Sequence, residues 1–280
     1  MIRLVTVTGS RTTTLKHMLN HYKNMVDEMC IVVYDWEEQS NLSEVQAIVS
    51  QFLNAKIVKI VVEEKYNWEK VTKLYNEVKS QHPNDWWVIS DDDEFHSYPL
   101  SLKTIISDCE LNGWDVVRGG FVDRIGIDGE MVELLDTDDI FEKFPYAGFF
   151  RHPLSGANPN KICIAKGYIQ LTSGQHYAEI NNQTTWRWQG WNHPLINPND
   201  YVQVHHFKWD STCGERIRAV ANIQKDYAFS EEYRVMYRAL AKTRFKLPID
   251  DVRFGFELSP TSHYLGYSKW KQLITKIIAI

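Results

Sequence analysis

Four consecutive acidic residues, 91–94 (DDDE), lie one serine after a short apolar run, residues 86–89 (WWVI). The apolar run is rich in aromatic and β-branched residues and is typical of a short buried strand. Carboxylates crowded at the end of a strand repel one another, so a cation is needed among them. Hard oxygen ligands suit Mg²⁺ or Mn²⁺, ions that usually also hold substrate phosphates. The pattern predicts a metal ion on Asp91 and Asp93 that binds a diphosphate.

The same acids allow a second interpretation. Residues 90–93 could cap a helix that begins near Glu94, because Ser and Asp side chains accept hydrogen bonds from the first backbone N–H groups of a helix. The residues by themselves leave both interpretations open.

The bulk composition is that of an ordinary globular protein. Of the 280 residues, 44% are hydrophobic and 24% charged, and the net charge of −5 gives no reason to expect nucleic acid as a partner. The four cysteines form no C-x-x-C pair, so neither zinc nor a disulfide framework is indicated and a reducing compartment fits best. We find no apolar run long enough for a transmembrane segment and no secretory signal, and we expect a cytoplasmic protein.

Strand-like and helix-like segments alternate through the first 110 residues. The spacing of apolar residues predicts strands over 2–7, 30–34, 57–62 and 86–89, and helices over 15–26, 45–53, 71–78 and 102–109. This alternation predicts an α/β fold with a mostly parallel sheet flanked by helices. Ligands bind such sheets at the carboxyl ends of the strands, which is where the acids lie.

The pattern changes in the later part of the chain. A strand over 115–122 contains Gly119 and Gly120, which suggests a bulge or a close backbone approach. Two short strands, 162–165 and 168–171, could form a hairpin, and a late strand covers 201–207. Helical spacing follows from residue 217 onward. We therefore expect an α/β catalytic domain over residues 1–210 and a helical C-terminal extension over 211–280.

The end of the first strand lacks a glycine-rich phosphate loop. Residues 8–11 (TGSR) match neither G-x-G-x-x-G nor the Walker pattern. If a nucleotide binds, a group other than a helix N-terminus must neutralise its diphosphate, and a metal ion on Asp91 and Asp93 would do so.

These residues resemble the D-x-D motif of nucleotide-sugar-dependent glycosyltransferases of the GT-A fold, in particular family-2-like members with a D-x-D-E-F form, here residues 91–95. The resemblance spans roughly the first three quarters of the chain. It also covers 68–76 (W-x-x-V-x-x-L-Y-N), 121–124 (FVDR), Lys161, 174–176 (GQH) and 206–209 (HFKW). It implies a GT-A-like, Rossmann-like sheet, a UDP- or GDP-linked sugar as donor, and a saccharide or glycoconjugate as acceptor.

The resemblance also implies roles for single residues. Asp93 and a late histidine, His206, would bind Mn²⁺ or Mg²⁺, and Asp91 would contact the metal or the ribose. Further donor-binding candidates are Thr8, Arg11, Asp35, Lys73, Asn76, Asp92 and Lys161. Arg11 could instead pair with a surface acid, and Lys161 could be a surface lysine at the start of a strand. Lys73 and Asn76 could simply lie on a solvated helix face.

An inverting transfer, our working expectation, needs a carboxylate base for the acceptor hydroxyl. Asp123 is the candidate, with Arg124 beside it to hold it ionised; a structural Asp–Arg pair is the alternative. Trp186, Trp188 and Trp191 could offer flat faces to a sugar acceptor or pack helices onto the sheet. Two rival functions remain, a metal-dependent phosphodiesterase or nucleotidyltransferase and a non-catalytic nucleotide-sugar-binding module.

Overall fold

The computed structural model confirms the α/β class and describes two compact units. The units comprise Met1–Gly120 with Asn160–Val204, and Phe121–Pro159 with His205–Ile280. The residues described are 1–9, 11–36, 41–64, 67–148, 150, 154–155, 160–180, 183–184, 202–223, 230–250 and 259–260. Strand β6 (Val116–Ile125) and strand β12 (Val202–His206) each contribute residues to both units. The domain boundary expected at residue 210 stays a prediction.

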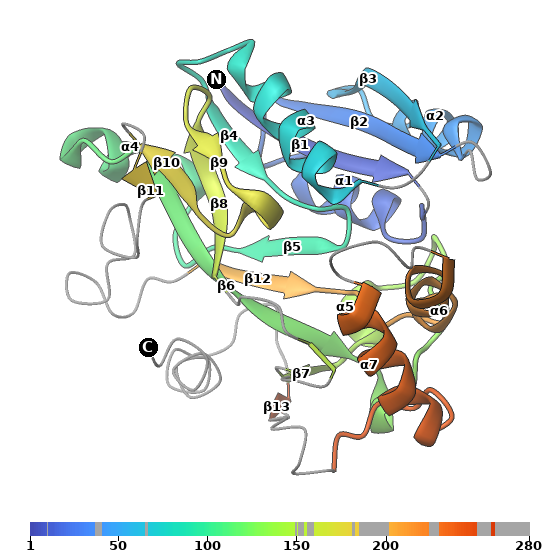
Figure 1. The fold of residues 1–280 in the computed structure, drawn as a ribbon. Coiled ribbons are helices and arrows are strands. Elements are labelled where there is room, and N and C mark those ends of the chain that lie inside the picture. The colour runs from blue at the N-terminus through green and yellow to red at the C-terminus, as the bar shows by residue number, and fades with distance from the viewer. Residues whose placement is uncertain are drawn as a thin grey trace. The chain divides into compact units, whose positions relative to one another are not determined.

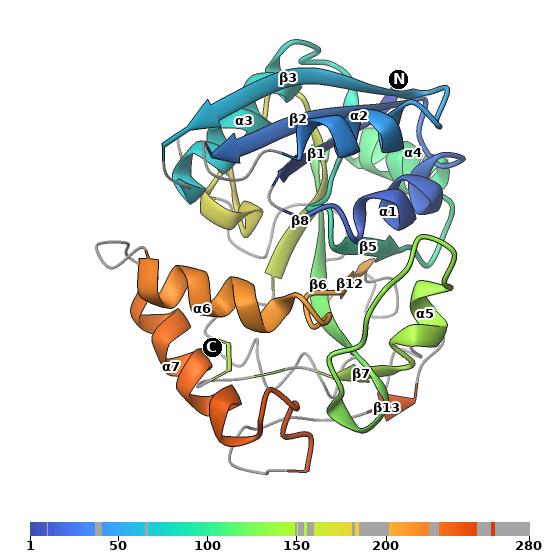
Figure 2. The ribbon, with the colours of Figure 1, turned by 90° about the vertical axis from the view of Figure 1, so that its right-hand side faces the viewer.

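The first unit begins with the predicted alternation of strands and helices (Figure 1). The elements are β1 (Ile2–Gly9), α1 (Leu15–Tyr22), β2 (Glu28–Trp36), α2 (Leu42–Val49), β3 (Ala55–Glu63), α3 (Trp68–Ser80) and β4 (Trp86–Ile89). The four strands are parallel, in the order β3-β2-β1-β4. Helices α1 and α2 lie on one face and α3 on the other (Figures 1 and 2), as right-handed crossovers require. The strand order therefore reverses between β1 and β4.

Beyond β4 the sheet becomes mixed. The following elements are β5 (Glu94–Ser97), α4 (Leu102–Asn112), β6, β8 (Asn160–Lys166), β9 (Gln170–Leu171), the 3₁₀ turn η2 (Ser173–Gln175), β10 (Ala178–Ile180) and β11 (Gln183–Thr184). Strand β8 is antiparallel to both β4 and β6, and β12 pairs with β5.

Two expectations are corrected by these elements. The segment from Glu94 is a strand, so the acids do not cap a helix there. Strand β9 pairs with β10 in a separate three-stranded sheet, so it does not form the expected hairpin with β8. Local alternation of apolar residues identifies short strands but does not select their partners.

The close approach predicted at Gly119 is confirmed. The β6–β8 register shifts between Val117 and Arg118. A Cβ atom on Gly119 would lie 2.6 Å from both the Cys163 sulfur and the Val202 carbonyl oxygen. Glycine is required there because a side chain would collide with the neighbouring backbone.

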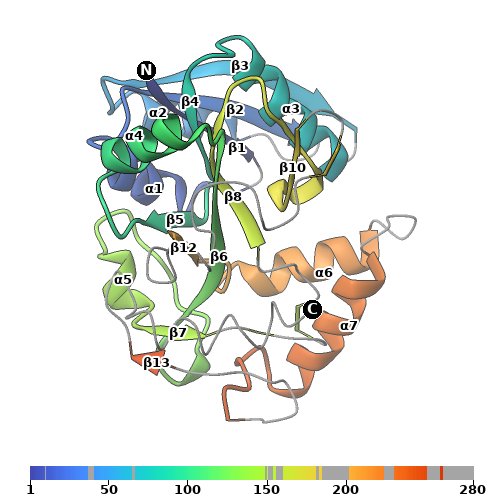
Figure 3. The same cartoon turned by 90° about the vertical axis from the view of Figure 1, so that its left-hand side faces the viewer.

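The second unit combines a short antiparallel sheet with a helical pair. Its elements are the end of β6, the 3₁₀ turn η1 (Ile127–Gly129), α5 (Ile140–Lys143), β7 (Tyr146–Gly148), α6 (Cys213–Ile223), α7 (Ser230–Lys242) and β13 (Ser259–Pro260). Strand β7 lies between β6 and β13. Helices α6 and α7 lie side by side (Figure 3) and bury an apolar cluster that includes Trp209, Ile217, Met236 and Leu240. Two of the helices expected from residue 217 to the C-terminus are thus present, whereas residues 251–258 and 261–280 lie outside the described part of the chain.

Among the described residues, we find no helix with both the length and the apolar character needed to cross a membrane.

Candidate functional site

The acidic run lies beside the end of β1, where the strand order of the first unit reverses. Two side chains from the β1 end bind it directly. The Thr8 hydroxyl donates to the Asp92 carboxylate at 2.7 Å, and the Arg11 guanidinium donates to the Asp93 carboxylate at 2.7 Å. The Arg11 side chain is only 6% exposed, so this is a largely buried ion pair. The structure therefore brings four of the predicted site residues together.

A fifth predicted residue, Lys161 on β8, supplies a second cation. Its ammonium lies 3.0 Å from Asp91 and 2.9 Å from Glu94, and it also donates to the Gly174 carbonyl at 3.0 Å and the Gln175 side chain at 2.9 Å. Burial alone would lower the pKa of Lys161, but the two carboxylates more than offset it and raise the pKa above its ordinary value. The lysine is therefore charged, and it holds the acids against the turn η2.

Tyr75 on α3 holds the other oxygen of Asp91. Its hydroxyl donates to that carboxylate at 2.7 Å and accepts from the Val7 backbone N–H at 3.2 Å. Burial, together with the negative charge of Asp91, raises the pKa of Tyr75 well above its ordinary value, so the phenol stays protonated. The Asp91 side chain is 33% exposed, which makes it more accessible than Asp93 and Glu94, the other two acids paired with Arg11 or Lys161.

The repulsion among the acids is relieved in two ways. The cations Arg11 and Lys161 pair with three of them, so the cation expected among the carboxylates is present as protein side chains. Burial raises the pKa of Asp92 to about 7, against the opposing charge of Arg11, and burial also raises the pKa of Glu94. Near neutral pH, part of the negative charge of Asp92 is thus removed by a bound proton.

The residues present fit a hard divalent cation with few protein ligands. Asp91 and Asp93 offer carboxylate oxygens at the end of one strand. Within the described part of the chain, no group of three or more His, Cys, Asp or Glu side chains could enclose a metal ion. Mg²⁺ in nucleotide sites is commonly held by one or two carboxylates, with phosphate and water completing the shell. Arg11 and Lys161 would have to share these oxygens with the ion.

Three other predicted donor residues in this unit have different surroundings. Asp35, at the end of β2, is buried and accepts from the Asn41 N–H at 3.1 Å. The Asn41 side chain also donates to the Gly9 carbonyl at 3.0 Å, so Asp35 lies near the end of β1. Asn76 bonds both the N–H and the carbonyl of Leu171, at 2.9 and 3.0 Å, and so ties α3 to β9. Lys73 is exposed on α3. Their binding roles stay predictions.

In the second unit, Asp123 is the centre of a polar cluster. Its Oδ1 atom accepts from Trp209 Nε1 at 3.1 Å and lies 3.2 Å from His206 Nδ1, and its Oδ2 atom accepts from the Phe150 N–H at 3.2 Å. The His206 ring stacks on Phe121, with ring centroids 5.0 Å apart. The structure thus joins the predicted base and the predicted histidine ligand in one cluster.

Arg124 does not form the expected pair with Asp123. Neighbouring residues of a strand point to opposite faces. Arg124 Nε donates to His205 Nδ1 at 3.1 Å, and the guanidinium lies 4.6 Å from the centre of the Phe141 ring. Burial lowers the pKa of Arg124 to about 9. The donors that support the Asp123 carboxylate are therefore Trp209, His206 and a backbone amide.

Sequence reasoning passed over three residues of these clusters as site residues: Tyr75, Glu94 and Trp209. All three belong to motifs that carried the resemblance. Tyr75 also lies on the apolar stripe of its helix, so the sequence pattern indicated a core residue and gave no sign that its hydroxyl binds Asp91. Trp186, Trp188 and Trp191 lie outside the described residues.

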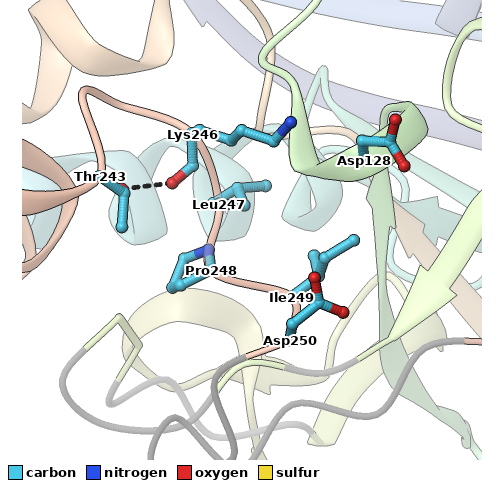
Figure 4. A pocket seen from close by; sticks show the side chains of 7 residues that line it. All are labelled: Asp128, Thr243, Lys246, Leu247, Pro248, Ile249 and Asp250. Carbon is cyan, nitrogen blue, oxygen red and sulfur yellow. Dashed lines mark hydrogen bonds between the residues drawn. The ribbon is translucent and has the colours of Figure 1, made fainter.

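A pocket of about 540 Å³ opens in the second unit, lined by Asp128 and by residues 243 and 246–250 (Figure 4). Lys246 on its rim pairs with Glu130 at 3.0 Å. The pocket contains none of the predicted site residues.

No protein-family model matches the chain, and no curated protein sequence matches it. Solved structures show only distant likeness. A structure of S. aureus TarS residues 1–349 in complex with UDP shares 12% identity at a TM-score of 0.35, over 90% of this chain and 73% of that one. A 4-diphosphocytidyl-2C-methyl-D-erythritol synthase shares 14% sequence identity at a TM-score of 0.31, over 60% of this chain and 75% of that one. A putative glucose-1-phosphate thymidylyltransferase from Bacillus anthracis shares 10% at 0.31, over 47% of this chain and 58% of its own length.

Proposed function

We propose that this chain is a metal-dependent glycosyltransferase with a GT-A-like donor site, which moves a sugar from a nucleotide-sugar donor to a saccharide-type acceptor. The observation that carries the proposal is the position of the acids. They follow β4 beside the end of β1, where the strand order reverses. In open α/β sheets, ligands bind outside the carboxyl ends of the strands at such a point.

The first unit would bind the donor. Asp91 and Asp93 would hold Mn²⁺ or Mg²⁺, which when bound stabilises the charge that develops on the leaving nucleoside diphosphate. Lys161 and Tyr75 each donate to a different oxygen of Asp91. Thr8 and Arg11 likewise orient Asp92 and Asp93. Carboxylates held in this way lose little further freedom when a ligand binds, which favours affinity.

Two further roles in the proposal come from the resemblance. His206 would be a further metal ligand, and Asp123 would be the general base for the acceptor hydroxyl. A general base has to reach the hydroxyl that it deprotonates. The Asp123 side chain is 7% exposed and engaged by three donors, whereas the His206 side chain is 19% exposed. The role of Arg124 stays a prediction from the sequence.

A thermal-shift panel tests the donor site. Nucleoside diphosphates and UDP- and GDP-sugars are screened with and without Mn²⁺, because a ligand that binds the native state raises the unfolding midpoint. We expect one nucleotide to stabilise the protein only with Mn²⁺ present, and the effect to vanish in Asp93→Ala. Glu69→Ala, which removes an exposed charge on α3, is the matched control and should respond like the wild type. Equal shifts in Asp93→Ala and wild type would contradict the proposal.

Product analysis separates the reaction classes. A glycosyltransferase releases free nucleoside diphosphate and forms a glycoside. A phosphodiesterase or nucleotidyltransferase instead releases a monophosphate or pyrophosphate. A binding module gives the Mn²⁺-dependent shift without turnover over long incubation.

A further inference from the structure

The contacts of Asp123 define how His206 is held. The carboxylate lies on the Nδ1 side of the ring, at 3.2 Å, and an ionised carboxylate can only accept a hydrogen bond. The proton of the neutral imidazole must then reside on Nδ1, which leaves the lone pair on Nε2. Stacking against Phe121, with the ring planes inclined by 28°, restrains rotation of the ring.

The carboxylate is itself fixed from two other directions. Trp209 Nε1 donates to the same oxygen that faces His206, and the Phe150 N–H donates to the other oxygen. Asp123 therefore has little freedom to turn toward a substrate hydroxyl. Three donors also satisfy much of its capacity to accept hydrogen bonds, which makes it a firm support for the ring.

We propose that Asp123 is a positioning residue, which holds His206 as the Nδ1–H tautomer so that Nε2 is presented as the ligating atom. A carboxylate bonded to the far nitrogen of a histidine is the usual outer support of a metal-binding imidazole. The assignment of Nε2 to a metal ion rests on the proposed function. The orientation of His206 by Asp123 rests only on the contacts within this cluster.

The tautomer is tested directly by long-range ¹H–¹⁵N NMR of the histidine rings, assigned with His206→Gln. We expect His206 in the wild type to show a protonated Nδ1 and an unprotonated Nε2 at pH values where the ring is neutral. In Asp123→Ala the ring should become a mixture of tautomers. A wild-type ring protonated on Nε2, or a ring unchanged in Asp123→Ala, would overturn the proposal.

Metal affinity gives the second measurement. Mn²⁺ titrations with the nucleotide found by the thermal-shift panel should show a 10- to 100-fold weaker Kd in Asp123→Asn, the usual effect of losing such a support. His206→Ala should weaken binding at least as much, and the double variant should be no weaker than His206→Ala, because the two residues act through one group. Asp210→Asn removes another buried carboxylate of this unit, one that accepts from the Thr212 backbone N–H at 3.0 Å, and should leave Mn²⁺ affinity unchanged.

The base hypothesis makes the opposite prediction. If Asp123 is the base, Asp123→Asn keeps wild-type Mn²⁺ and nucleotide affinity and loses transfer at every metal concentration. If it is a positioning residue, excess Mn²⁺ restores part of the activity. Should the wild type bind no Mn²⁺ at all, the metal in the proposed function fails, and the NMR measurement alone decides the role of Asp123.

Discussion

The Lys161 ammonium lies 2.9 Å from the Glu94 carboxylate, and the two side chains are only 4% and 2% exposed. Their pairing places a positive charge at the end of β4, among carboxylates that the chain supplies in sequence. Burying either ion alone would be strongly unfavourable, so each makes the burial of the other possible.

Lys161→Met should destabilise the protein strongly, because it leaves the Glu94 carboxylate buried without its cation. Removing one partner of a buried pair typically costs about 3–5 kcal/mol. Urea unfolding measures the loss, with Lys73→Met on the exposed face of α3 as the control. Adding Glu94→Gln should recover much of the stability, since the buried carboxylate left without its cation is then removed. A Lys161→Met protein as stable as the Lys73→Met control would contradict this account.

Tyr75→Phe should lower both stability and Mn²⁺–nucleotide affinity, because the hydroxyl holds Asp91 at 2.7 Å. A lost hydrogen bond to a charged group costs about 1.5–3 kcal/mol. Tyr22→Phe removes another buried hydroxyl, one that accepts from the His96 N–H at 2.7 Å and does not touch Asp91. It should lower stability with little effect on affinity. Chemical unfolding and calorimetry on both variants check this, and equal affinity losses would count against the role of Tyr75.

His176 should contribute a loss of stability as the pH falls from about 6.5 toward 4, whereas the raised pKa values of Asp92 and Glu94 act in the opposite direction. Burial, with the charge of Lys161 adding to it, lowers the pKa of His176 to about 4. Between that value and its ordinary pKa, the unfolded chain binds a proton that the folded chain does not, so acid favours unfolding. One proton corresponds to at most about 1.4 kcal/mol per pH unit. His176→Gln should reduce the pH slope in this window, as measured by urea unfolding at several pH values. An identical slope in the variant would contradict the prediction.

Gly119→Ala should destabilise the protein, because the added methyl group would meet the Val202 carbonyl oxygen and the Cys163 sulfur at 2.6 Å. Overpacking of this kind costs about 1–3 kcal/mol, and the backbone oxygen cannot rotate away. The double variant Gly119→Ala/Cys163→Ala removes the contact with the sulfur and is compared with the single variant. Thermal unfolding should show that it recovers only part of the loss, because the backbone contact remains.

The alternation of strands and helices was readable from the sequence because the helices carry apolar residues at helical spacing and the central strands, buried on both faces, are short continuous apolar runs. The parallel order β3-β2-β1-β4 follows from that alternation together with right-handed crossovers. The pairing of β9 with β10 could not be read in this way, because a two-residue strand carries no pattern that selects a partner. The partner of Arg124 could not be predicted either. Its side chain lies on the opposite face of the strand from Asp123 and donates to His205.

What the sequence determined by itself is the composition of the proposed donor site: four acids one serine after an apolar strand, with Thr8 and Arg11 at the end of another. Only the tertiary structure decided which charged side chains form ion pairs. Lys161 is 70 residues from Asp91 in the chain, and it reaches that carboxylate because β8 packs antiparallel against β4. Long-range ion pairs depend on the register of neighbouring strands, and that register is determined by the packing of the whole sheet and not by the residues of either strand alone.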